Sequence, residues 1–95
     1  MSFTLEQSEV FLTEILDKYP IPQPETLDEI RKFLGVGETE IAFESAMLCY
    51  IQQSTEFGTE ERKLILEHAK SLKLDEETMY LDDFFDKLVI FLNIT

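Results

Sequence analysis

The stretch from Ile41 to Ile51 most constrains the fold, because its side chains are apolar in nearly every direction. Glu44 and Ser45 are the polar residues within it. A helix that is apolar on most sides must be packed by neighbours on more than one face. A strand is the competing prediction for Met47 to Ile51, and the polar residues on either side favour a helix. We therefore expect a central helix that begins near Glu38.

Four further segments show the periodicity of amphipathic helices, with apolar side chains on one face. They are about Leu5 to Tyr19, Leu27 to Leu34, Glu60 to Leu72 and Thr78 to Leu92. Each begins beside a residue suited to capping: Thr4 with Gln7, Thr26 with Glu29, Thr59, and Asp75 or Thr78. Short connections join them, so the sequence predicts an all-α fold, a compact bundle of about five helices in a single domain, 1–95.

Prolines and glycines mark the predicted boundaries. Pro20, Pro22 and Pro24 alternate with other residues, so the first connection should be extended and stiff. Gly35 stands where a left-handed residue commonly ends a helix. Gly37 then suits a tight turn before the central helix.

The charge balance is the most unusual bulk property of the chain. Twenty acidic residues against eight basic ones give a net charge of −12. Such a surface attracts basic partners and repels phosphate backbones and anionic lipid. The alternative is that the charge serves solubility alone.

The acidic residues gather at two places that should lie outside the core. The first is the start of the central helix, with Glu38, Glu40 and Glu44. The second runs from the end of the fourth helix into the fifth, with Asp75, Glu76, Glu77, Asp82, Asp83 and Asp86. Tyr80 lies among the second group and suits an aromatic anchor in a protein interface. We therefore predict that these ten residues bind a partner, although helix N-termini and solvated faces would also account for the acids.

Few residues suit catalysis, a metal ion or a cofactor. His68 is the single histidine and Cys49 the single cysteine. A structural histidine and a buried, inert thiol are the expected roles. Zinc would lack ligands, and the acidic run from Asp75 to Asp86 has no glycine for a calcium loop. No cofactor, metal or catalytic residue is predicted, and an enzyme is disfavoured for want of a nucleophile–base pair.

Three further features bear on partners and location. The basic residues are scattered rather than arranged in a stripe, which argues against nucleic-acid binding. There is no apolar run long enough to span a bilayer and no secretory signal in the sequence. With a single cysteine, these features predict a cytoplasmic protein without a membrane association.

Part of the sequence resembles a known family. The segment from Leu27 to Leu34 is followed by Gly37-Glu-Thr-Glu-Ile-Ala-Phe-Glu44, a Gly–Glu turn that opens a helix. Further on come Thr59-Glu60-Glu61 and the link Leu72-Lys73-Leu74. Over about Leu27 to Leu74, this pattern is similar to MafI-like and related immunity proteins of polymorphic-toxin and contact-dependent inhibition systems. The Pro-rich connection and the aromatic last helix lie outside the pattern.

The resemblance implies a cytoplasmic inhibitor that binds a cognate toxin domain, often a basic nuclease. Glu38, Glu40 and Glu44 lie within the matching motif. The chain also broadly resembles immunity proteins of nuclease colicins, but it lacks their consecutive tyrosines. The alternative function is a small acidic adaptor or regulatory domain, dimerising through its aromatic C-terminal helix if Phe84, Phe85 and Phe91 exceed what the core can bury.

Overall fold

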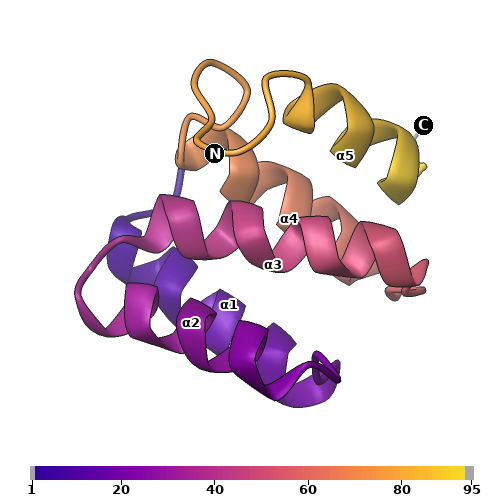
Figure 1. Ribbon diagram of the computed structural model, residues 1–95. Helices are drawn as coiled ribbons and strands as arrows, with labels where there is room; N and C mark the ends of the chain where they lie inside the picture. Colours follow the sequence, from indigo (N-terminus) through magenta and orange to yellow (C-terminus); the bar gives the residue numbers. More distant parts are fainter. Residues whose placement is uncertain (1, 94–95) are drawn as a thin grey trace.

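Helix α3 (Thr39–Gln53) forms the centre of the molecule. In the computed structural model, which describes residues 2–93, α3 contacts α1, α2 and α5. Figure 1 shows it in magenta, with α1 and α2 on one side and α4 and α5 on the other. Ala42, Phe43, Ala46, Met47 and Tyr50 of α3 have no exposed surface. The prediction of a central helix is confirmed.

Five helices account for the regular structure of residues 2–93, and no strand occurs among those residues. The bundle is therefore all-α and compact, as predicted. The helices are α1 (Leu5–Lys18), α2 (Pro24–Gly35), α3 (Thr39–Gln53), α4 (Thr59–Ser71) and α5 (Phe84–Leu92). None of the helices in this range is long and apolar enough to cross a membrane.

The predicted cap of α1 is present, and it shows why this helix begins where it does. The Gln7 amide N–H donates to the Thr4 hydroxyl at 3.1 Å, and the Thr4 amide N–H donates to the Gln7 side chain at 2.9 Å. Two of the otherwise unpaired N–H groups of the first turn are satisfied in this way.

Helix α2 begins earlier than predicted. Pro24 occupies its first turn, where a missing N–H costs nothing, and Gln23 precedes it. The predicted cap at Thr26 is therefore wrong. At the other end Gly35 is still helical, and Gly37 adopts the positive φ of 81° that turns the chain into α3. The left-handed residue is thus Gly37, not Gly35.

The sequence predicts that the last helix begins near Thr78, but α5 begins at Phe84. The residues before it form turns and irregular structure, and the backbone amides of Met79, Tyr80 and Leu81 bond to the side chain of Glu44. Such N–H groups are also free in the first turn of a helix, but here the Leu81 carbonyl oxygen accepts from the Thr78 hydroxyl and the Phe84 amide, and the helix begins only at Phe84. The predicted start of the last helix is therefore wrong.

Tyr50 ties α3 to the end of α1. Its hydroxyl donates to the Tyr19 carbonyl oxygen at 2.7 Å, and its ring meets the edge of Phe57 at 5.1 Å between centroids. Burial raises the pKa of the Tyr50 phenol, so it stays protonated as a donor. This contact joins the C-terminal part of α3 to the C-terminal end of α1.

Candidate functional site

The start of α3 places two predicted residues on the surface. Glu38 precedes the helix and Glu40 lies in its first turn, and both side chains are exposed. The first turn carries unpaired N–H groups and the positive end of the helix dipole, which favours carboxylates there. Gly37 makes the turn that brings Glu38 to this position.

The connection between α4 and α5 carries the second predicted group. We call residues 72–83 the acidic loop. Leu74 is 3% exposed and anchors it in the core, while Asp75, Glu76 and Glu77 are exposed. The Thr78 hydroxyl donates to the Leu81 carbonyl oxygen at 2.6 Å and closes a turn further along. Asp82, Asp83 and Asp86 are also exposed, and Asp83 lies 3.9 Å from the Lys87 ammonium.

The structure brings the two acidic groups together. A groove of about 520 Å³ lies between the start of α3 and the acidic loop, and we call it the acidic groove. Its lining residues are Glu38, Glu40, Ile41, Glu44, Leu72, Lys73, Leu74, Glu77, Thr78 and Met79. A smaller hollow of about 100 Å³ adjoins it through Leu74, Glu77 and Thr78, and includes Asp75, Glu76, Asp82, Asp83 and Asp86. Residues far apart in sequence thus share one face. We call the surface formed by the acidic groove, the smaller hollow and the acidic loop the acidic face.

Glu44 does not lie where a partner could reach it. Its side chain has no exposed surface, and its carboxylate accepts hydrogen bonds from the Met79, Tyr80 and Leu81 amides at 2.8, 2.9 and 3.1 Å. The expectation that Glu44 lies outside the core is therefore wrong. Helical spacing put it beside Glu40, but the irregular loop folds back over it.

Tyr80 follows Met79 in the acidic loop and is 48% exposed. Burial of part of its ring raises the pKa of the phenol, and the nearby carboxylates of Glu29, Glu44 and Glu38 raise it further. Glu29 belongs to α2 and was not among the predicted site residues. The sequence alone does not show that the Glu29 carboxylate lies near enough to Tyr80 to raise the pKa of its phenol.

Met79 is the second residue that sequence reasoning missed. Its periodicity placed it in the apolar face of the last helix, yet its side chain is 65% exposed and lines the acidic groove. An exposed methionine is a flexible apolar contact that adapts to varied partner surfaces. Met79 and Tyr80 therefore supply adjacent apolar contacts within the acidic face.

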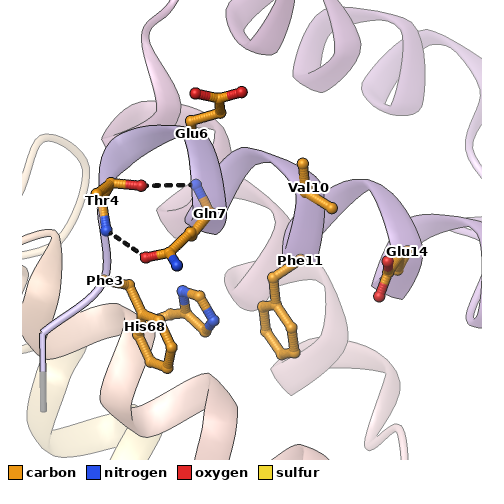
Figure 2. Close-up of a pocket in the computed structure, with 8 residues that line it drawn as sticks. All are labelled: Phe3, Thr4, Glu6, Gln7, Val10, Phe11, Glu14 and His68. Carbon is orange, nitrogen blue, oxygen red and sulfur yellow. Dashed lines mark hydrogen bonds between the residues drawn. The ribbon is translucent and has the colours of Figure 1, made fainter.

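A second hollow, of about 590 Å³, lies over the start of α1 and contains His68 at its base. Figure 2 shows the His68 ring between the rings of Phe3 and Phe11, below the paired Thr4 and Gln7. The ring centroids of Phe3 and Phe11 lie 3.8 and 4.3 Å from that of His68, in stacked orientation. His68 is only 3% exposed.

His68 also pairs with a serine that sequence reasoning missed. The Ser8 hydroxyl lies 2.7 Å from His68 Nδ1, an arrangement that activates serine in some hydrolases. Here Ser8 has no exposed surface, and burial lowers the pKa of His68 to about 4. Ser8 is closed to a substrate and His68 is a weak base. Their hydrogen bond therefore serves to join α1 to α4. The structural role expected of His68 agrees with this geometry.

Cys49 is the other reactive side chain that the sequence singled out. Cys49 is half-buried, and burial raises the pKa of its thiol, so the nucleophilic thiolate is disfavoured. Within residues 2–93, histidines, cysteines and carboxylates do not form a group of three that could hold a metal ion. The acidic face is the candidate site in which the predicted residues come together. Comparison with family models, curated proteins and solved structures finds no match for this chain.

Proposed function

We propose that this chain is an immunity protein that binds and neutralises a basic toxin domain, such as a nuclease, through the acidic groove and the acidic loop. The observation that carries the proposal is the convergence of the two acidic segments. Glu38 and Glu40 share the groove with Glu77, which follows them by more than thirty residues in sequence. A nuclease groove that binds phosphates is complementary to such a surface.

The electrostatics of this face support a basic partner. Glu38, Glu40 and Glu77 line the groove together with one basic residue, Lys73. The net charge of −12 adds a long-range field of the same sign. Fields of this kind steer oppositely charged proteins into contact and accelerate association.

Met79 and Tyr80 supply the apolar part of the interface. They are 65% and 48% exposed, adjacent in sequence, and surrounded by carboxylates. Protein interfaces combine a few aromatic or apolar anchors with a charged rim. In this proposal, Met79 and Tyr80 pack against the toxin while the acids pair with its basic residues.

The resemblance to MafI-like immunity proteins supports the same function. The matching segment, about Leu27 to Leu74, includes Glu38 and Glu40 and reaches the first residues of the acidic loop. An immunity protein of this kind acts in the cytoplasm, where it protects the producing cell. Partner binding by Asp75, Glu76, Glu77, Asp82, Asp83 and Asp86 rests on charge and position.

The test is co-expression with the product of the adjacent open reading frame, followed by affinity capture of this chain. A one-to-one complex and relief of the neighbour's toxicity are expected. Glu38→Lys and Asp82→Lys should each weaken the complex by about tenfold or more, since a mismatched charge at an interface is repulsive. Glu14→Lys makes the same change on the exposed face of α1 and should leave binding close to wild type.

The outcomes separate clearly. Absence of a complex and of protection would refute the immunity function for that gene pair. Equal weakening by all three reversals would instead mean that net charge matters and the acidic face does not. Loss of binding at Glu38 and Asp82 alone would assign the interface to that face.

A second candidate is a homodimeric adaptor that associates through α5. Ile90 is 77% exposed on this helix, and Phe85 and Val89 are half-buried, whereas Phe84 is fully buried. Some apolar surface of α5 is thus uncovered in the single chain. Sedimentation of the free protein tests this: a dimer that Ile90→Lys dissociates, and that salt does not weaken, would favour the adaptor.

A further inference from the structure

Glu44 stands out because it is a fully buried acid beneath an irregular loop. Its Oε1 accepts a hydrogen bond from the Met79 amide at 2.8 Å. Its Oε2 accepts from the Tyr80 and Leu81 amides at 2.9 and 3.1 Å. Three consecutive backbone N–H groups therefore converge on one carboxylate from α3, across more than thirty residues of sequence.

The geometry requires a carboxylate rather than another polar side chain. A carboxylate presents acceptors on both oxygens, whereas glutamine presents one acceptor oxygen and one donor group. A glutamine in the same place could still accept from Tyr80 and Leu81, but its NH₂ group would face the Met79 N–H. Burying a charged group is costly unless it is hydrogen-bonded, and these three amides supply the bonds.

The same bonds fix which way the acidic loop faces. The backbone N–H groups of Met79 and Tyr80 are directed at Glu44, while their side chains are 65% and 48% exposed. The Thr78 hydroxyl bond to the Leu81 carbonyl holds the other side of the turn. In the absence of helix or strand, these contacts order the segment.

We infer that Glu44 is a positioning residue, whose buried carboxylate holds Met79 and Tyr80 in the conformation that receives the partner. The part that concerns the partner rests on the proposed function. An interface that is ordered before binding loses less conformational freedom on association. Glu44 thus contributes to binding without touching the partner, whereas the exposed Glu38 and Glu40 contact it directly.

Amide hydrogen exchange tests the positioning role without any partner. In the wild-type protein the Met79, Tyr80 and Leu81 amides should exchange slowly for residues outside a helix. In Glu44→Gln they should exchange at least about tenfold faster, which is the expected size for loss of a hydrogen bond to a charged group. Core amides of α3 should keep their protection, and Glu14→Gln, which removes an exposed charge, should change none of these rates.

Each exchange result decides the inference. Rapid exchange of the three amides in the wild-type protein would overturn it, and this result needs no variant to fold. Unchanged exchange in Glu44→Gln would overturn it as well. An equal acceleration across α3 would mean that Glu44 supports the whole fold and does not position the loop.

Affinity for the adjacent gene product then tests the link to binding. With the loop loosened and the core intact, Glu44→Gln should weaken the complex about tenfold, mainly through faster dissociation. Faster exchange with unchanged affinity would refute the positioning role in recognition. If the wild-type chain binds no such product, the proposed function fails, and the exchange result still decides whether Glu44 orders the loop.

Discussion

At the scale of single residues, two buried polar groups show different solutions to the same physical problem. Glu44 is matched by three backbone donors, so its carboxylate is solvated by the protein itself. His68 has the Ser8 hydroxyl and two stacked phenyl rings, which favour the neutral imidazole. Burial lowers its pKa to about 4, although the nearby Glu67 opposes this shift.

This shift predicts a loss of stability in mild acid. Above pH 6.5, the ordinary pKa of histidine, neither the folded nor the unfolded chain protonates His68, and its full contribution is present. Between pH 6.5 and about 4, only the unfolded chain binds the proton, so stability falls as the pH falls. The whole effect is about 3 kcal/mol, and urea denaturation at successive pH values measures it.

A double variant isolates this contribution from the many carboxylates. Ser8→Ala with His68→Phe removes both polar partners and leaves neither one unsatisfied. The variant should lose less stability than the wild type between pH 6.5 and 4, by about the amount given above. Parallel pH curves for the two proteins would show that His68 is protonated without cost in the folded state.

At the scale of elements, the turn between α2 and α3 depends on one glycine and tolerates change at another. Gly37 has a φ of 81°, which strains any side chain, whereas Gly35 ends α2 with open space where a Cβ atom would lie. Gly37→Ala should lower the free energy of unfolding by about 1 kcal/mol or more. Gly35→Ala should raise it by up to about 1 kcal/mol, because alanine favours the helix.

Chemical denaturation of this matched pair checks the assignment of the two glycines. Equal effects would show that the turn relaxes and that the positive φ is not required. Because Gly37 leads directly into Glu38, the alanine variant should also disturb the acidic groove. A weaker complex with Gly37→Ala than with Gly35→Ala would link the turn to recognition.

The elements that could be predicted are those whose signals are local. The Thr4–Gln7 cap and the central helix were each predicted from residues close together in the sequence, and both predictions are confirmed. The predicted start of α5 is wrong because Thr78 has the features of a helix cap, yet its hydroxyl donates to Leu81 instead. The amides that follow Thr78 bond to Glu44, which is remote in sequence and carries no signal that it points inward.

At the scale of the whole molecule, the two acidic clusters were predictable but their convergence was not. Glu38 and Glu77 line the same groove because α4 returns the chain to the start of α3. That return depends on the packing of several helices, which no local pattern specifies. The same reason explains why Glu29 and Met79 were missed. Glu29 comes near Tyr80 from α2, and Met79 lies in a loop that the sequence predicts to be helical.

The charge of the whole molecule yields the last prediction, on salt. The radius of gyration is 12.0 Å and the net charge −12, so at low salt most acidic pairs lie within one screening length. Folding gathers these charges, so screening should favour the folded state. Between about 10 and 300 mM NaCl we expect a gain of about 1 kcal/mol, or roughly 4–8 °C in Tm.

The same salt series should slow association with a basic partner, because screening removes the attraction that steers it. Stability and association rate therefore move in opposite directions as salt rises, which distinguishes a charged recognition surface from an apolar one. Calorimetry and stopped-flow mixing in the same buffers measure both. A Tm that falls with salt would show that ion pairs such as Lys18–Glu61, at 2.8 Å, outweigh the repulsion among the acids.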